Sequence, residues 1–320
     1  MDKDVFAPKP KSPMGPWDVV VIGSGPSGLT AAIYTTRGAA STLIFGGEVW
    51  GGQLMLTTMV DNFPGFPEGI LGPELMEKMK KQAERFGAEF VGVNVDSIDD
   101  TKKPFEIKSG GKTYLARSVI VATGAETVWL DAPGIKKLIG KGISSCAPCD
   151  APFFRGKKVA VVGGGDSAME EASVLTKYAS EVTLIHRRDE FKASAAMQEK
   201  VKNDPKVKIM WNSEVIEAIG ETKLEKLVIK NNETGETAEV PFDGLFIAIG
   251  HKPTSDIFAR QIERDERGYI LKKTWHSGTS TRGIFVAGDV TDKHFRQAVV
   301  STGMGCMAAM EALEYLEEDK

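Results

Sequence analysis

The sequence contains little cysteine, no long apolar run and no excess of positive charge. Three cysteines in 320 residues are too few for a framework of structural disulfides, which favours a reducing compartment, the cytoplasm. No stretch reaches the roughly 18 consecutive apolar residues of a membrane span, and the N-terminus lacks the apolar core of a signal peptide. A formal net charge of −4 does not supply the clustered Lys and Arg that bind nucleic-acid phosphates. We therefore expect a globular protein with neither a membrane nor a nucleic acid as partner.

The chain is long enough for two compact domains with cores of their own. Hydrophobic residues make up 42% of it and charged residues 26%, which is typical of globular proteins. Residues 1–16 are rich in Pro and Lys and are predicted to form a flexible N-terminal arm.

Two of the three cysteines, Cys146 and Cys149, are separated by two residues and followed directly by Asp150. Thiols at this spacing can close a small disulfide ring, and one can stabilise the other as a thiolate, which lowers the cysteine pKa from about 8.5 toward about 7. The pair is the candidate reaction centre, with Asp150 as proton donor to the leaving thiolate. The alternative is half of a zinc site. Because Cys306 and the four histidines are scattered, we expect no metal.

A glycine-rich loop lies near the N-terminus, between a predicted strand (17–22) and a predicted helix (29–37), with another strand at 42–45. The pattern G-x-G-x-x-G gives a tight bend, a close backbone approach to a pyrophosphate and close packing of helix on strand, although a plain glycine-rich turn is the alternative. The second strand ends without a carboxylate at its tip, where Gly46 and Gly47 precede Glu48; these three residues are also candidates for cofactor binding. The candidate cofactor-binding residues of the loop are Gly23, Ser24, Gly25, Pro26, Ser27 and Gly28.

The same unit recurs later in the chain as a predicted strand (158–162), a G-x-G-x-x-A loop, a helix (169–178) and a strand (181–185). Two copies are far less accidental than one, so two dinucleotides are expected. Basic residues follow the second copy where an NAD site would carry an acid, which favours the 2′-phosphate of NADPH over the alternative of a solvated basic face. The candidate residues are Gly163, Gly164, Gly165, Asp166, Ser167, His186, Arg187, Arg188 and Lys192.

Two glycines, Gly124 and Gly250, end similar apolar runs and mark crossings between a first domain and an inserted one; both, together with Gly288, are also candidate cofactor-binding residues. Further strands are predicted at 90–95, 105–107, 113–115, 118–122, 245–249 and 283–289, and helices at 72–86 and from 298 to about 315. The segment 51–67 is predicted to be an irregular loop, either over a ligand or on the surface. Asp289, beside Gly288 at a strand tip, is a candidate acceptor for ribose or ribityl hydroxyls, or a simple turn residue.

With these pieces in order, the chain from about Trp17 to its C-terminal helix resembles the low-molecular-weight bacterial-type thioredoxin reductases. The matching motifs are Gly23-Ser-Gly-Pro-Ser-Gly28, Gly51-Gly-Gln-Leu54, Asp61-Asn-Phe-Pro-Gly65, Cys146-Ala-Pro-Cys-Asp150, Gly163-Gly-Gly-Asp-Ser-Ala168, His186-Arg-Arg188, Ala287-Gly-Asp-Val290 and Arg296-Gln-Ala298. The resemblance implies an α/β fold of two Rossmann-like doubly wound domains, with an NADPH domain (125–250) inserted into an FAD domain (17–124 and 251–320), in a homodimer. It adds these FAD-binding residues: Gly52, Gln53, Leu54, Asn62, Arg296, Gln297 and Ala298.

The resemblance also implies the reaction. Hydride passes from NADPH to FAD, then two electrons pass to the Cys146–Cys149 disulfide and on to thioredoxin or a thioredoxin-like protein, with Cys149 facing the flavin and Cys146 attacking the partner. Lys192 stands where the family commonly has a third arginine, so NADPH preference is expected to depend on Arg187 and Arg188. Phe153 and Phe154, with Lys141 before them, are candidates for docking the partner; the alternative for the two phenylalanines is ordinary packing in the core. Alternatives are a related reductase of another disulfide or peroxidase partner, a ferredoxin or flavodoxin reductase, and a redox-sensing or metal-binding protein that carries FAD passively.

Overall fold

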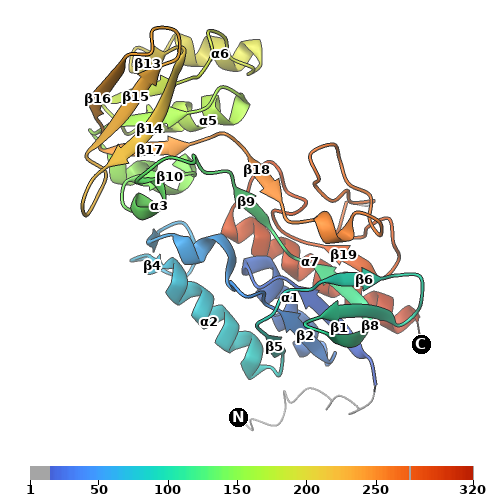
Figure 1. The fold of residues 1–320 in the computed structure, drawn as a ribbon. Helices are drawn as coiled ribbons and strands as arrows, with labels where there is room; N and C mark the ends of the chain where they lie inside the picture. Colours follow the sequence, from blue (N-terminus) through green and yellow to red (C-terminus); the bar gives the residue numbers. More distant parts are fainter. Residues whose placement is uncertain (1–14, 274, 320) are drawn as a thin grey trace. The chain divides into compact units, whose positions relative to one another are not determined.

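The computed structural model describes residues 15–273 and 275–319. Within them the chain forms two compact units, one from residues up to 126 together with those from 252 onward, and one from residues 127–251 (Figure 1). The second unit is therefore inserted into the sequence of the first. The predicted N-terminal arm, residues 1–16, lies almost entirely outside the described residues.

The first unit is built on one seven-stranded sheet. Its strands are β1 (Trp17–Ile22), β2 (Thr42–Phe45), β5 (Glu89–Val91), β6 (Ser97–Asp99), β7 (Phe105–Ser109), β8 (Lys112–Val121) and β19 (Ile284–Val286). β5, β2, β1 and β8 lie side by side in parallel, and β19 also pairs in parallel with β8. β7 and β6 extend the sheet beyond β8 as antiparallel strands. The parallel strands carry the apolar β-branched residues that a sheet buried on both faces requires.

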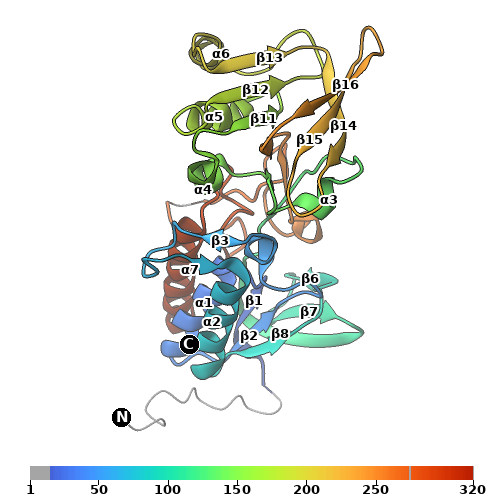
Figure 2. The ribbon, with the colours of Figure 1, turned by 90° about the vertical axis from the view of Figure 1, so that its left-hand side faces the viewer.

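Three helices cover one face of this sheet: α1 (Pro26–Arg37), α2 (Gly72–Arg85) and α7 (Ala298–Glu318) (Figure 2). Their apolar residues form one core with β1 and β2, while Phe258, Ile262 and Ile270 close the core on the opposite face. Pro26 starts α1, where its missing N–H costs nothing. The smaller elements are η2 (Gly52–Leu56), β3 (Met59–Val60), β4 (Ile70–Leu71) and η4 (Asp256–Phe258).

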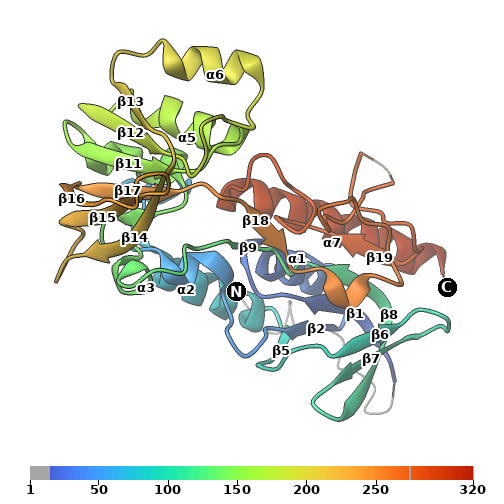
Figure 3. The ribbon, with the colours of Figure 1, turned by 45° about the horizontal axis from the view of Figure 1, so that its top comes forward.

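The second unit contains a five-stranded parallel sheet in the order β10, β17, β11, β12, β13. These strands are β10 (Ile143–Ser144), β11 (Lys158–Val162), β12 (Glu181–Ile185), β13 (Val207–Met210) and β17 (Gly244–Ile247). One face packs against α5 (Asp166–Leu175) and α6 (Ala195–Lys202). The other face packs against a three-stranded antiparallel sheet formed by β14 (Ser213–Ile219), β15 (Lys226–Asn231) and β16 (Thr237–Pro241) (Figure 3). The remaining elements of this region are β9 (Ala125–Thr127), α3 (Ile135–Leu138), α4 (Ala147–Asp150), η3 (Ala151–Phe154) and β18 (His251–Pro253).

The predicted α/β class with two Rossmann-like domains is confirmed. Strands β1, β2, β11 and β12 begin and end at the predicted residues. Other bounds were wrong: β5 ends at Val91 rather than at 95, and the two strands predicted at 113–115 and 118–122 are one strand, β8. The segment 51–67, predicted to be irregular, contains the 3-10 helix η2.

Candidate functional site

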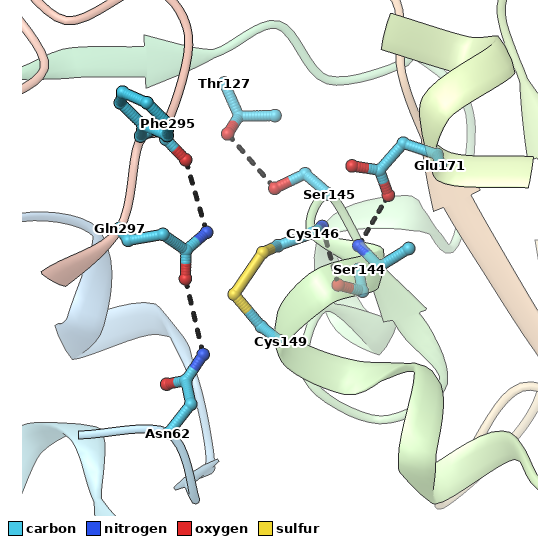
Figure 4. The surroundings of a disulfide bond; sticks show 10 residues. Asn62, Thr127, Ser144, Ser145, Cys146, Cys149, Glu171, Phe295 and Gln297 are labelled. Carbon is cyan, nitrogen blue, oxygen red and sulfur yellow. Dashed lines mark hydrogen bonds between the residues drawn. A yellow bond between two sulfur atoms is a disulfide. The ribbon is translucent and has the colours of Figure 1, made fainter. Parts of the chain in front are cut away.

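The two neighbouring cysteines form a disulfide, Cys146–Cys149, with their Cα atoms 5.3 Å apart (Figure 4). The residues after Cys146 form the single helical turn α4, and the carbonyl of Cys146 accepts hydrogen bonds from the N–H groups of Cys149 (3.2 Å) and Asp150 (3.1 Å). Pro148, inside this turn, has no N–H of its own to satisfy. The tight turn therefore brings the predicted thiol pair within bonding distance.

Residues from two neighbouring elements hold the backbone on either side of Cys146. The Cys146 N–H donates to the hydroxyl of Ser144 at 3.1 Å, and the Ala147 N–H donates to the carboxylate of Glu171 in α5 at 2.5 Å. The hydroxyl of Ser145 pairs with that of Thr127 at 3.2 Å. Figure 4 shows these side chains around the disulfide.

Asp150 is placed where a proton donor is useful. Burial raises the pKa of its carboxyl group above the ordinary aspartate value, and a hydrogen bond with the Ser144 side chain opposes this by stabilising the ionised form. A carboxyl group with a raised pKa one residue from Cys149 is suited to protonate a leaving thiolate.

The first glycine loop connects β1 to α1 and has the geometry of a dinucleotide loop. Gly23 has φ +116°, and a Cβ there would lie 2.1 Å from the carbonyl oxygen of Ala122. A Cβ at Gly28 would lie 2.0 Å from the carbonyl oxygen of Gly23, so helix and loop approach too closely for any side chain. Gly25 differs, because its φ is −69° and no described atom lies within 4 Å of a Cβ built there. Nothing in the described chain requires glycine at position 25, which is what a space kept for a pyrophosphate predicts.

Residues from two other segments surround this loop. The hydroxyl of Ser24 donates to the carbonyl of Gly46 at 2.7 Å and accepts from the N–H of Gly51 at 2.9 Å. Gly52, in η2 with Gln53 and Leu54, has φ +69° and packs against Gly25. Gly46 and Gly52, each in one of the predicted segments, therefore lie at the first glycine loop.

The acid at the tip of β19 is also close to α1 and α7. Burial raises the pKa of Asp289 to about 6, although the hydroxyl of Ser301 donates to its carboxylate at 3.0 Å. A Cβ at Gly288 would lie 2.6 Å from the hydroxyl of Ser27, which places the strand tip against the start of α1. Asn62 donates a 3.3 Å hydrogen bond to Gln297, the residue just before α7. Predicted residues from four distant stretches of sequence thus belong to one region of the first unit.

The second glycine loop, between β11 and α5, repeats the geometry of the first. Gly163 has φ +155°, and a Cβ there would lie 2.5 Å from the carbonyl oxygen of Ala248. Gly165 has φ −100°, and no described atom lies within 4 Å of its hypothetical Cβ. The Asp166 carboxylate accepts from the N–H of Ser194 at 2.8 Å. Both loops therefore fit a dinucleotide by the same criterion.

The basic residues after β12 divide into a buried and an exposed group. The His186 ring packs against Gly164 and against the rings of Phe191 and Trp211, which also contact each other, and its Nε2 lies 2.9 Å from the carbonyl oxygen of Glu190. Arg187, Arg188 and Lys192 are exposed, and the N–H of Lys192 donates to the carbonyl of Gly164 at 2.7 Å. The backbone at Lys192 therefore lies against the second glycine loop, while the three cationic side chains face solvent.

The two predicted crossing points, Gly124 and Gly250, have φ values of +69° and +124°. Gly124 directly precedes β9 and Gly250 directly precedes β18, so both lie within two residues of the points at which the chain passes from one unit to the other. Among the described residues, no three His, Cys, Asp or Glu side chains are arranged to hold a metal ion. None of the helices in residues 15–273 and 275–319 is long and apolar enough to cross a membrane.

Sequence patterns did not identify Ser144, Glu171 or Ser301. Each acts through its neighbours: Ser144 on Asp150, Glu171 on the backbone beside Cys146, and Ser301 on Asp289. A signal for Glu171 existed only in its position, on the first helix after the second glycine loop, and that position alone does not indicate which way a side chain points.

The comparisons with known proteins agree with this geometry. A family model described as pyridine nucleotide-disulphide oxidoreductase matches residues 17–305. The chain is 48% identical over 316 residues to thioredoxin reductase 2 of Arabidopsis thaliana, covering 94% of this chain and 82% of that protein. It is 47% identical over 305 residues to the thioredoxin reductase of Chlamydia pneumoniae, covering 93% of this chain and 98% of that one. The solved structure of thioredoxin reductase from Giardia duodenalis superposes with a TM-score of 0.90 at 43% identity, covering 94% of this chain and 99% of that chain.

These similarities confirm the resemblance that the motifs predicted, the class of flavoprotein disulfide oxidoreductase, and the cofactors FAD and NADPH. The chain belongs to the pyridine nucleotide-disulphide oxidoreductase family and, within it, to the low-molecular-weight thioredoxin reductases.

Proposed function

We propose that this protein is a thioredoxin-disulfide reductase, which uses NADPH to reduce the disulfide of thioredoxin or a thioredoxin-like protein. The observation that carries the proposal is the Cys146–Cys149 disulfide with the raised-pKa carboxyl of Asp150 beside it, in the unit that also carries the second glycine loop. The net reaction transfers two electrons and two protons: NADPH, a proton and the partner disulfide give NADP⁺ and the partner dithiol.

We assign FAD binding to residues 17–124 and 251–320 and NADPH binding to residues 125–250. Gly25 and Gly165 support this assignment, because no described atom of the chain fills the space beside either glycine, which leaves room for a pyrophosphate. FAD, when bound, accepts hydride from NADPH and supplies two electrons to the disulfide. The FAD-binding residues we propose are Gly23, Ser24, Gly25, Pro26, Ser27, Gly28, Gly46, Gly47, Glu48, Gly52, Gln53, Leu54, Asn62, Gly124, Gly288, Asp289, Arg296, Gln297 and Ala298; those for NADPH are Gly163, Gly164, Gly165, Asp166, Ser167, His186, Arg187, Arg188, Lys192 and Gly250.

The chain's own residues divide the thiol chemistry between them. The Cys146 thiolate attacks one sulfur of the partner disulfide and forms a mixed disulfide, and the other partner sulfur leaves as a thiolate. The Cys149 thiolate then attacks Cys146, which restores the Cys146–Cys149 bond and releases the second partner thiolate. Asp150 supplies a proton to a leaving thiolate, as its raised pKa favours.

Phe153 is the candidate for docking the partner protein. It is 43% exposed, whereas Phe154 is buried and packs edge-on against Phe246. An exposed aromatic ring four residues after Cys149 is suited to contact a protein whose disulfide is being reduced. Phe154 instead contributes to the core of the second unit.

We propose a homodimer that buries one apolar stripe of α7. Val299, Met307 and Met310 are exposed at helical spacing on this helix, and the exposed Tyr34 of α1, which is hydrogen-bonded to Cys306, adds to the same apolar region. Sedimentation velocity is expected to show a dimer for the wild type and a monomer for Met310→Glu. A wild-type monomer would contradict this part of the proposal. We propose the cytoplasm as the compartment, since Cys306 remains a free thiol.

The function is tested by the absorbance spectrum and substrate range of the purified protein. We expect a yellow flavoprotein that NADPH bleaches at lower concentration than NADH does, and rapid NADPH oxidation with thioredoxin disulfide but not with glutathione disulfide or ferredoxin. A colourless protein that does not take up FAD would overturn the proposal. Efficient reduction of a peroxidase component but not of thioredoxin would favour the alternative of another disulfide partner.

A further inference from the structure

Glu171 is the acidic side chain in direct contact with the backbone of the thiol pair. Its Oε2 accepts a 2.5 Å hydrogen bond from the N–H of Ala147, the residue that directly follows Cys146. Ala147 is fully buried, whereas Glu171 is half-buried. Its carboxylate therefore meets the first turn of α4 from the side of α5 (Figure 4).

The ionisable side chains on α4 and on α5, the helix that packs against it, are all acidic. On α4 itself the ionisable side chain is Asp150, and on α5 they are Asp166, Glu170 and Glu171. Glu170 is exposed, and Asp166 is engaged at the N–H of Ser194. β10 and η3, which flank α4, contain no ionisable residue. Glu171 is thus the carboxylate that α5 brings to the peptide beside Cys146.

A negative charge beside a dithiol destabilises its thiolate form and leaves the disulfide unaffected, since a disulfide carries no ionisable proton. Destabilising the reduced form makes the pair a stronger reductant. We propose that Glu171 is a positioning residue with an electrostatic role: it fixes the backbone at Cys146, and its charge makes the Cys146–Cys149 dithiol more strongly reducing. This rests on the proposed function, in which the dithiol must reduce a protein disulfide.

The influence of the Glu171 charge on the thiol–disulfide equilibrium should depend on pH. Where both thiols are protonated, the charge of Glu171 has no thiolate to act on, so removing it changes little. As pH rises and a thiolate forms, the dithiol of a Glu171→Gln variant is stabilised relative to the wild type. The difference between the two proteins therefore grows from pH 6 to pH 8.5, a dependence that loss of a structural contact alone would not produce.

The test is a redox equilibrium with glutathione, in which enzyme dithiol and glutathione disulfide give enzyme disulfide and two glutathione thiols. The FAD-containing wild type and Glu171→Gln are equilibrated at fixed ratios at pH 6, 7 and 8.5, and the oxidised fraction of the Cys146–Cys149 peptide is measured by alkylation and mass spectrometry. Glutamine keeps a hydrogen-bond acceptor for Ala147 but removes the charge. We expect the equilibrium constant for oxidation to fall about three- to tenfold at pH 8.5 and to be unchanged at pH 6.

Two further variants separate charge from contact. Glu170→Gln, the exposed neighbour on the same helix, is expected to leave the glutathione equilibrium at its wild-type value. Glu171→Ala loses both contact and charge. If Glu171→Gln matches the wild type at pH 8.5 while Glu171→Ala does not, the carboxylate is only a structural acceptor and the proposal is wrong. Because this equilibrium needs neither NADPH nor thioredoxin, a failure here is distinct from a failure of the proposed function.

Discussion

The hydroxyl of Ser144 hydrogen-bonds to the side chain of Asp150 and also accepts a 3.1 Å hydrogen bond from the N–H of Cys146. One serine thus connects the candidate proton donor to the backbone of the candidate nucleophile. Because its hydrogen bond stabilises the ionised carboxylate, Ser144 keeps the pKa of Asp150 from rising as far as burial alone would raise it.

Replacing Ser144 by Ala is therefore expected to raise the pKa of Asp150 further. A donor must be protonated to act, so a higher pKa keeps it active to higher pH and moves the alkaline limb of the pH profile of kcat upward. The measurement is turnover of NADPH with thioredoxin across pH. Ser145→Ala is the matched control, because Ser145 pairs with Thr127 instead; a limb that stays in place in Ser144→Ala, or moves equally in both variants, contradicts the assignment.

Gly25 and Gly165 each have open space where a side chain would begin, so replacing either by alanine should weaken the binding of one cofactor without unfolding the protein. Gly25→Ala adds a methyl group that meets no described atom, so its thermal stability without FAD should match that of the wild type while FAD affinity falls by an order of magnitude or more. Gly28→Ala should destabilise the protein itself, since its Cβ would lie 2.0 Å from a backbone oxygen. Thermal melting of flavin-stripped protein, together with FAD titration, distinguishes the effect of Gly25→Ala from that of Gly28→Ala. A Gly25→Ala variant that binds FAD normally would contradict the assignment of the first loop to FAD.

The same logic applies to NADPH. Gly165→Ala is expected to keep bound FAD and the melting temperature but to raise KM for NADPH strongly, because no described atom competes for the space at Gly165. Steady-state kinetics alongside a flavin spectrum give the measurement. Unchanged kinetics in this variant would mean that the second loop does not approach the nucleotide.

Arg187 and Arg188 are expected to set the preference for NADPH over NADH. Their replacement together by Ala should raise KM for NADPH by about 10- to 100-fold with little change in kcat, while kinetics with NADH stay near wild type. Lys177→Ala, an exposed cation of the same unit, is the control. Equal losses with both nucleotides would show that the two arginines act on something other than the 2′-phosphate.

Asp289 predicts a pH dependence of stability for the protein without FAD. The pKa of Asp289 in the folded protein, about 6, lies above the ordinary value of 3.8. The protonated carboxyl therefore stabilises the folded state fully below about pH 4. As pH rises through 6, the free energy of unfolding falls by an amount on the order of 3 kcal/mol. Asp289→Asn should therefore stabilise flavin-stripped protein at pH 7.5 but not at pH 4, and should weaken FAD binding. Thermal melts at the two pH values measure this stability change. If the fold instead stabilises Asp289 as a carboxylate, Asp289→Asn will destabilise the protein at pH 7.5.

Much of the fold could be predicted because strong patterns coincide with buried elements. The apolar runs that became β1 and β11 are followed at once by glycines, so their ends are fixed by the loop chemistry. The antiparallel sheet of β14, β15 and β16 was not predicted, because its strands mix exposed charges with apolar residues. α1 and α5 begin earlier than predicted, since their first residues belong to the glycine motifs.

The site could be predicted only as far as its motifs extend. The cysteine pair and the two loops identify themselves by spacing, whereas Ser144 and Glu171 act through a hydroxyl and a carboxylate that the sequence does not orient. His186 shows the opposite case: it lies in a basic motif, yet its ring is buried against the rings of Phe191 and Trp211. The sequence His-Arg-Arg does not indicate that the first of its three residues is buried while the other two are exposed.

The most direct measurement compares wild type, Cys146→Ser and Cys149→Ser for two activities in the same samples: bleaching of bound flavin by NADPH, and reduction of thioredoxin disulfide. If electrons leave through the Cys146–Cys149 pair, both variants keep FAD and are bleached by NADPH, while reduction of thioredoxin falls by about a thousandfold or more. Thioredoxin reduction that survives at the wild-type rate in either variant would contradict the account.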